Sequence, residues 1–219
     1  LKKMGVKISW ISKRKIKIIG NQSLKSASHT IMFDRIEAGT FIIAGALTGN
    51  KLKILGIEPK ILNKEISTLK LMGVKLKSGK NYVTVLNSKN IKPTSIKTEP
   101  YPGFPTDLQA QIMVLMTKAN GVSKIRENIF EKRFMHVPEL IRMGAKIKIF
   151  GDTSFVYGPQ QLNGAEVMAT DLRASVSLVL AALSARDKTI VNRVYHLDRG
   201  YEKIETKLRR CKANIFRKN

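Results

Sequence analysis

A short phrase recurs four times along this chain, and its spacing limits the folds that the chain can adopt. The copies begin at residues 1, 69, 140 and 208 and read LKKMGVKI, LKLMGVKL, LIRMGAKI and, in a degenerate form, LRRCKANI. Self-similarity at a period of about 70 residues indicates a tandem array of one supersecondary unit. The first copy is only the tail of such a unit, and residue 1 is Leu. We therefore expect the chain to be the C-terminal part of a longer protein.

The composition allows a large core and excludes several classes of protein. Hydrophobic residues make up 43% of the 219 residues, enough to form one large or two small domains. The longest apolar runs, 41–47 and 176–183, are too short to cross a bilayer, so no membrane association is expected. A single cysteine excludes an internal disulfide framework and fits a reducing cytosol.

The charge is strongly positive, yet its distribution does not favour a nucleic-acid partner. The chain has 40 Lys and Arg against 16 Asp and Glu, a net charge of +24. The lysines are spread through every segment and alternate with apolar residues, as in Lys15–Ile19. Such alternation is typical of the solvent face of half-buried strands. Since charge alone is weak support for a partner, we expect no nucleic-acid binding.

The sequence pattern within each repeat predicts the same order of elements: a helix, a strand, a second helix, then two strands joined as a hairpin. In the first unit, Asp34 precedes Glu37 by the three residues of a capping box. Gly49 can end that helix in the left-handed conformation. The other elements of this unit are expected at 51–55 (strand), 63–73 (helix), 74–77 and 82–86 (strands).

The second and third units repeat this order. Thr106 or Asp107 should cap a helix that runs to about residue 118, and Thr170 or Asp171 should cap one that runs to 183. A later helix should carry Tyr201, Ile204 and Leu208 on one buried face. The other elements are expected at 123–128, 145–150, 155–158, 188–193 and 213–216 (strands) and at 138–144 (helix).

The units predict how the chain is divided. A strand pair over 5–20 would complete an earlier unit, and the polar stretch 21–28 would carry the chain between two lobes. Because each unit has a sheet face and a helical layer, the repeats must bury these surfaces against one another. We expect two parts: residues 1–31, the end of another lobe with a crossover, and residues 32–219, an α/β lobe of three units with pseudo-threefold symmetry.

The acidic residues at the starts of the three long helices mark a candidate site. Asp34, Asp107 and Asp171 occupy equivalent positions, and helix N-termini that converge favour an anionic ligand. For Asp34 we expect a capping role only. The segments near the other two also carry arginines, whose planar guanidinium groups pair with phosphate and carboxylate. These arginines are Arg133, Arg173 and Arg199.

Two interpretations of this cluster are open. A carboxylate beside several arginines would suit group transfer on a doubly charged substrate. Structural salt bridges, however, use the same residue types.

Four longer motifs carry a resemblance to a known family. They read FPTDLQAQ (104–111), RFMHVPEL-x-RMGA (133–145), GAEVMATDLRAS (164–175) and HLDRGYEKIE-x-KL (196–208). In this order they resemble the UDP-N-acetylglucosamine 1-carboxyvinyltransferases, the enolpyruvyl transferases that open bacterial peptidoglycan synthesis. The resemblance covers essentially the whole chain, as the C-terminal half of a protein of roughly doubled length. It implies an inside-out α/β barrel of two lobes, each of three βαβαββ-type repeats, with the active site between the lobes.

The resemblance also implies a reaction. Enolpyruvyl would pass from phosphoenolpyruvate to the 3-hydroxyl of UDP-N-acetylglucosamine, by addition and then elimination of phosphate. This is the first committed step of peptidoglycan synthesis, so a cytoplasmic enzyme of cell wall biogenesis is implied, with links to cell shape, the cell cycle and cell division. The resemblance implies that this reaction needs no cofactor and no metal ion. His136 and His196 have no metal-ligand partner at suitable spacing, and we expect structural roles for both.

The matched positions imply roles for six residues. Asp107 corresponds to the base that contacts the sugar hydroxyl, and Asp171 to an acidic residue near the reacting centre. Ile129 corresponds to a contact with the nucleotide part of the substrate. The arginines correspond to residues that hold phosphoenolpyruvate or swing as the cleft closes; they are Arg133, Arg173 and Arg199.

The chain departs from the family pattern in several places. It lacks the Lys-Asn pair and the loop cysteine that the family carries in its N-terminal half. Cys211 is no substitute, since it replaces the Met of the repeated phrase, a position expected in the core. Lys212 stands where the phrase has Gly, and Phe33 stands where the family usually has Pro.

These departures lead to an expectation about activity. We expect the missing N-terminal half to be required as a partner and the isolated chain to be inactive. The alternative is a non-catalytic remnant or a one-lobe binding module of the same family.

Overall fold

The computed structural model describes residues 1–21 and 23–218, which fall into two compact units. The first unit spans Leu1–Phe33. Its hairpin confirms the strand pair expected over 5–20, and nearly every hairpin side chain is exposed. The elements of this unit are a short 3-10 helix, η1 (Lys2–Met4), and the antiparallel strands β1 (Lys7–Ser12) and β2 (Lys15–Ile19).

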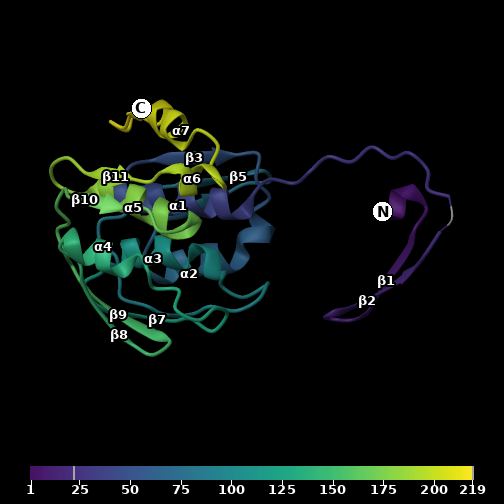
Figure 1. Ribbon diagram of the computed structural model, residues 1–219, viewed down its shortest axis with the longest axis horizontal. Coiled ribbons are helices and arrows are strands. Elements are labelled where there is room, and N and C mark those ends of the chain that lie inside the picture. Colours follow the sequence, from purple (N-terminus) through teal and green to yellow (C-terminus); the bar gives the residue numbers. More distant parts are fainter. Residues whose placement is uncertain (22, 219) are drawn as a thin grey trace. The chain divides into compact units, whose positions relative to one another are not determined.

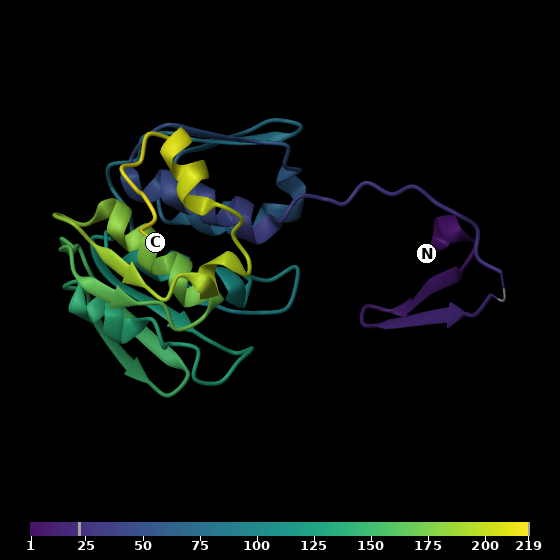
Figure 2. The same ribbon diagram turned by 45° about the horizontal axis from the view of Figure 1, so that its top comes forward.

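Three mostly buried helices form the centre of the second unit, which begins at Asp34. They are α1 (Arg35–Thr48), α3 (Gln109–Met116) and α5 (Leu172–Ser184). The three helices contact one another, and the strands lie on their outer sides (Figure 1). In Figure 2 the same helices lie between the blue strands of the first repeat and the green strands of the second. All eight residues of α3 are buried, including Gln109 and Gln111. The other six are apolar, and a helix with so little polar surface is favoured inside a core.

The starts of these helices confirm two of the predicted caps and correct the third. The carboxylates of Asp34 and Asp171 each accept hydrogen bonds from two backbone N–H groups in the first turn of α1 and α5. The cap predicted at Thr106 or Asp107 is wrong. A 3-10 turn, η3 (Thr106–Leu108), precedes α3, and neither side chain caps it. Both side chains instead bind residues from a segment that follows α3.

In the described part of the second unit, the strands form one sheet for each repeat. The first sheet has the order β3-β5-β4, the second β6-β7-β9-β8, and the third pairs β10 with β11. Their bounds are β3 (Leu52–Leu55), β4 (Leu76–Ser78), β5 (Tyr82–Val85), β6 (Ser95–Lys97), β7 (Gly121–Arg126), β8 (Lys146–Phe150), β9 (Thr153–Gly158), β10 (Glu166–Met168) and β11 (Ile190–Asn192).

Most strands lie where the sequence predicts them, to within two residues at either end. The exceptions are β6 and β10, which the sequence analysis missed. Each is three residues long, too short to show an alternating pattern. Each pairs in parallel with the strand that follows its helix, so β6-α3-β7 and β10-α5-β11 are equivalent βαβ units.

The recurring phrase is the end of a helix. In every copy the residue at the Gly position has a positive φ, a conformation that Gly adopts without a Cβ clash. The values are 94° for Gly5, 84° for Gly73, 95° for Gly144 and 68° for Lys212. The helices that end there are η1, α2 (Asn63–Leu71), α4 (Val137–Arg142) and α7 (Ile204–Arg210); two further short helices are η2 (Pro59–Leu62) and α6 (Tyr195–Asp198).

The C-terminal part of the third repeat differs from the prediction. Tyr201, Ile204 and Leu208 are buried together, as expected, and pack against Val176 and Val179 of α5. The single helix predicted to carry all three is wrong, because Tyr201 lies between α6 and α7 and only Ile204 and Leu208 are in α7. The strand predicted at 213–216 is wrong. A strand needs a neighbouring ladder for its backbone groups, and in the part of the chain that is described, β11 pairs only with β10. The N–H groups of Ala213 and Ile215 bind carbonyls nearby in the sequence instead.

Cys211 also corrects an expectation. Its counterparts Met72 and Met143 are fully buried, whereas Cys211 is exposed. In the first two repeats a hairpin follows the phrase, while no strand follows it in the described residues of the third. The residue at this position of the phrase is therefore buried only where a sheet covers it, and this part of the chain forms none.

Among the described residues, none of the helices combines the length and apolar character that crossing a bilayer requires.

Candidate functional site

Asp107 lies between two arginines that come from different segments of the chain. Its Oδ1 accepts a hydrogen bond from Arg133 Nη2 at 2.9 Å, and its Oδ2 accepts one from Arg173 Nη2 at 3.1 Å. Asp107 is on η3, Arg133 on the loop between β7 and α4, and Arg173 in the first turn of α5. The side chains are 34%, 23% and 19% exposed, respectively. The structure therefore brings three of the six predicted site residues into direct contact, where solvent can reach them.

Asp171 fixes the start of the helix that carries Arg173. Its Oδ1 accepts hydrogen bonds from the backbone N–H groups of Arg173 at 2.7 Å and Ala174 at 2.9 Å. The carboxylate thus acts as a helix cap, two residues before an arginine of the site. Because both bonds lie within the first turn of α5, Asp171 fixes the backbone that carries Arg173.

Arg199 is not paired with the other predicted residues. It follows the last residue of α6, and its side chain is exposed. No ion pair among the described residues includes it.

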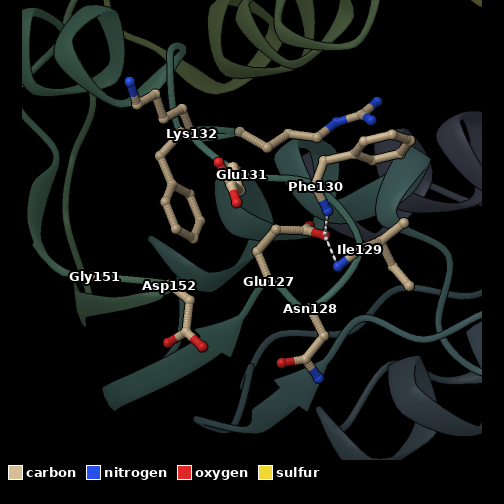
Figure 3. A pocket seen from close by; sticks show the side chains of 10 residues that line it. Glu127, Asn128, Ile129, Phe130, Glu131, Lys132, Gly151 and Asp152 are labelled. Atoms are coloured by element: carbon tan, nitrogen blue, oxygen red, sulfur yellow. Dashed lines mark hydrogen bonds between the residues drawn. The ribbon is translucent and has the colours of Figure 1, made fainter.

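The loop that carries Arg133 lines a cavity of about 470 Å³ (Figure 3). Ile129, which is half-buried, also lines this cavity. The guanidinium carbon of Arg133 lies 4.7 Å from the centre of the Phe130 ring, a favourable cation–π contact. Phe130 therefore helps to hold the guanidinium beside the cavity. The full lining is 127–134 with Gly151 and Asp152 from the β8–β9 turn.

A buried carboxylate that the sequence analysis missed holds this loop. Glu127 is 4% exposed. Its Oε1 accepts hydrogen bonds from the Thr98 hydroxyl at 2.8 Å and from the N–H groups of Ile129 at 2.9 Å and Phe130 at 3.2 Å. Its Oε2 accepts one from the Thr106 hydroxyl at 2.9 Å. A glutamate directly after a strand looks like a surface residue, so the sequence carried no signal for this role.

A second buried network lies next to Asp107. The Tyr201 hydroxyl is 2.9 Å from Thr40 Oγ1 on α1 and accepts a hydrogen bond from Gln111 Nε2 on α3 at 3.3 Å. Gln111 Nε2 also donates to the backbone carbonyl of Asp107 at 2.9 Å. Burial raises the pKa of Tyr201, an effect that its hydrogen bond with Thr40 partly opposes. The network ties three segments together beside the site. Its members are far apart in the sequence, so no local pattern could have revealed it.

His136 is a buried neighbour of the site. Burial lowers its pKa to about 4; the charge of Asp171 opposes this shift and that of Arg133 adds to it. Its Nε2 lies 3.2 Å from Met113 Sδ. With this pKa the imidazole is uncharged at neutral pH, which suits the structural role expected for it. Within the described part of the chain, no three His, Cys, Asp or Glu side chains are grouped so as to hold a metal ion.

The cluster can both bind an anion and accept a proton. Two guanidinium groups present N–H donors to a single carboxylate, and a phosphate or carboxylate ligand can take over these bonds. A ligand that does so releases an oxygen of Asp107, which can then accept a proton from a hydroxyl group. The geometry therefore suits group transfer between a negatively charged donor and an alcohol.

Comparison with known proteins agrees with this chemistry. The sequence model of the family described as EPSP synthase (3-phosphoshikimate 1-carboxyvinyltransferase) matches residues 1–208. A protein of Pelagibacter ubique (strain HTCC1062) is 57% identical over 216 residues, which is 99% of this chain and 52% of that relative. One of Koribacter versatilis (strain Ellin345) is 54% identical over 217 residues, 99% of this chain and 50% of the relative. Both are named UDP-N-acetylglucosamine 1-carboxyvinyltransferase, which confirms the resemblance seen in the motifs.

The chain spans about half the length of the curated relatives it matches. Solved structures share its fold. The enolpyruvyl transferase NikO from Streptomyces tendae superposes with a TM-score of 0.89 at 30% identity, over 97% of this chain and 51% of that one. EPSP synthase from Acinetobacter baumannii superposes with a TM-score of 0.73 at 16% identity, over 96% of this chain and 52% of that one, a likeness of fold alone. The predicted α/β class is confirmed at this level, and the chain belongs to the EPSP synthase (3-phosphoshikimate 1-carboxyvinyltransferase) family.

Proposed function

We propose that this chain forms one side of the active site of a UDP-N-acetylglucosamine 1-carboxyvinyltransferase. The reaction is the transfer of enolpyruvyl from phosphoenolpyruvate to the 3-hydroxyl of UDP-N-acetylglucosamine, with release of phosphate. The observation that carries the proposal is the Asp107 carboxylate held between Arg133 and Arg173. The names of the two relatives above support the choice of substrates.

The arginines bind the donor in this mechanism. Phosphoenolpyruvate carries a phosphate and a carboxylate, and each can accept paired N–H bonds from a guanidinium group. When Arg133 and Arg173 bind these groups, their bonds to Asp107 are replaced. Asp107 then accepts the proton of the sugar hydroxyl as the sugar oxygen bonds to C2 of phosphoenolpyruvate, and C3 takes a proton from water. In the second step the resulting hydroxide takes one proton back from C3 and the bond from C2 to the phosphate oxygen breaks. The phosphate leaves with the proton held by Asp107, which regenerates the carboxylate.

Three further residues complete this side of the site in our proposal. Ile129 contacts the nucleotide part of the sugar substrate, because it lines the cavity beside Arg133. Asp171 lies near the reacting centre and holds α5 in place through its cap. Arg199, exposed and outside the ion pairs of the described residues, is the arginine that is free to move onto bound phosphoenolpyruvate.

We also propose that residues 32–219 form one lobe of an inside-out α/β barrel with pseudo-threefold symmetry, and that residues 1–31 end the other lobe. The support is the strand order shared by the first two repeats (β3-β5-β4 and β7-β9-β8), the parallel strand pair shared by the second and third, and the central position of α1, α3 and α5. The repeated helix ends after η1, α2, α4 and α7 add to it. On this proposal the enzyme acts in the cytoplasm, in cell wall biogenesis and hence in cell shape, the cell cycle and cell division.

Reconstitution tests the function. The part of the Pelagibacter ubique relative that this chain does not match is expressed with the chain, and phosphate release from phosphoenolpyruvate and UDP-N-acetylglucosamine is measured. We expect no turnover from the chain alone, turnover from the pair, and its loss with Asp107→Ala. Asp34→Asn is the matched control, because asparagine also caps helices and Asp34, which caps α1, is in no ion pair among the described residues.

Two outcomes would count against this function. Turnover by the isolated chain would show that the second part is not needed. Binding of UDP-N-acetylglucosamine by the pair without any phosphate release would favour the alternative, a non-catalytic remnant or a one-lobe binding module.

A further inference from the structure

Glu127 lies where the two segments that carry Asp107 and Arg133 meet. It directly follows β7 and begins the loop that leads to Arg133. Its Oε1 binds the backbone of that loop at Ile129 and Phe130. Its Oε2 accepts a hydrogen bond from Thr106, the residue before Asp107. One carboxylate therefore joins the loop to the 3-10 turn η3.

The surroundings of Glu127 make this junction rigid. The carboxylate is 4% exposed, and no ion pair among the described residues includes it. Its four hydrogen bonds must therefore offset the loss of hydration. Thr98, which is fully buried, donates one of these four bonds. The Thr98 hydroxyl oxygen also accepts a separate hydrogen bond from the Asn128 N–H at 2.9 Å. The Glu127 N–H donates to the Asp152 carbonyl at 2.8 Å.

We propose that Glu127 is a positioning residue that sets the distance between Asp107 and Arg133. This inference rests on the proposed function, because the separation of base and donor-binding group matters for that reaction. Asp107 Oδ1 and Arg133 Nη2 are 2.9 Å apart, and a shift of about 1 Å would end their hydrogen bond. Misplacing reacting groups by this amount can lower a rate by about 100-fold.

Single-atom changes separate positioning from stability. Thr106→Val removes one hydroxyl and leaves the other three bonds of Glu127 in place. Glu127→Gln should retain the junction, since its carbonyl oxygen can accept the three bonds at the Oε1 position while its amide donates to the Thr106 hydroxyl. Thr153→Val is the matched control: the Thr153 hydroxyl also donates to a carboxylate, that of the exposed Asp152, which contacts Glu127 only through its backbone carbonyl.

The first readout is the Arg133 guanidinium signal in nitrogen-detected NMR of the whole chain, assigned with Arg133→Lys. Pairing with a carboxylate slows rotation of the guanidinium group, and Asp107→Asn gives the signal of the broken pair. We expect Thr106→Val to shift the Arg133 signal toward that of Asp107→Asn. Glu127→Gln and Thr153→Val should match the wild type. A wild-type Arg133 signal in a folded Thr106→Val chain would overturn the proposal, and so would a broken pair in Glu127→Gln.

The second readout is the kinetics of the reconstituted pair. Thr106→Val should lower kcat by about 10- to 100-fold while KM for phosphoenolpyruvate changes by less than about threefold, because the arginines remain present. An equal loss of activity and of folded protein, with kcat per folded molecule unchanged, would contradict a positioning role. Absence of turnover in the wild-type pair would instead contradict the proposed function, and the NMR comparison would still decide the role of Glu127.

Discussion

Arg173 on α5 and Asp107 on η3 are 66 residues apart in the sequence, yet Arg173 Nη2 and Asp107 Oδ2 lie 3.1 Å apart. This contact joins the first turn of one central helix to the turn that precedes another. Arg133 binds the second oxygen of the same carboxylate. Asp107 thus holds two like charges together, and removing it would leave two guanidinium groups facing each other.

The Asp107–Arg173 pair should contribute modestly to stability. In a double-mutant cycle with Asp107→Asn and Arg173→Met, we expect a coupling energy of about 0.5–1 kcal/mol at low salt, since both side chains are partly exposed. Urea unfolding at low and high salt measures it, and the coupling should fall as salt screens the charges. The exposed pair Arg126–Asp152 should show weaker coupling. A coupling that did not depend on salt would contradict an electrostatic origin.

Replacing Lys212 by glycine should stabilise the protein. Lys212 holds a φ of 68° at the position where the other copies of the phrase have glycine. A side chain with a Cβ is strained in this region, so Lys212→Gly should raise the free energy of unfolding by about 0.5–1 kcal/mol. Chemical denaturation checks this value.

The converse substitution is Gly144→Ala. Gly144 has a φ of 95°, and an added Cβ would meet no atom nearer than 3.7 Å. The expected loss, about 1 kcal/mol, therefore comes from the backbone alone. A neutral Gly144→Ala would show that this turn relaxes freely and would remove the basis for the Lys212 prediction.

His136 should make stability depend on pH. Burial lowers its pKa in the folded protein to about 4, below the ordinary value of 6.5. The unfolded chain therefore binds this proton more readily, and the free energy of unfolding rises with pH between about 4 and 6.5. A shift of this size corresponds to about 3 kcal/mol. Unfolding measured across this range should show a shallower slope for His136→Gln, and equal slopes would refute the assignment.

Tyr201→Phe should weaken the contact between α1 and α3. The Tyr201 hydroxyl bonds to Thr40 and Gln111, and all three residues are buried. Its loss should lower the free energy of unfolding by about 1 kcal/mol, the net value of such a hydrogen bond. Tyr82→Phe is the control, because no hydrogen bond among the described residues involves the Tyr82 hydroxyl. A similar loss in both variants would point to a general effect of removing a hydroxyl.

Local signals predicted a large part of the fold. Asp34 and Asp171 cap their helices because the groups that they bind lie two and three residues away in the sequence. The glycine of the repeated phrase ends its helix for a similar reason, since the φ it adopts is a property of that residue itself. Asp107 has an equivalent position, but the prediction failed there, because two arginines from distant segments bind its carboxylate.

The candidate site was predictable only in part. Motif resemblance pointed to six residues, and the structure brings Asp107, Arg133 and Arg173 into contact. Glu127 escaped notice, since a glutamate after a strand is ordinary on a surface, and only packing against Thr98 and Thr106 reveals that it is buried. The roles of all six residues in binding and catalysis stay predictions.

The sequence by itself determined the period of the repeat, the order of most of its elements and the family, because each depends on residues that are neighbours along the chain. Only the tertiary structure decided which carboxylate caps a helix and which binds arginine, that β6 and β10 are strands, and that Cys211 is exposed. These features depend on partners tens of residues away. Their hydrogen bonds and burial form only once the segments pack together, so no local pattern encodes them.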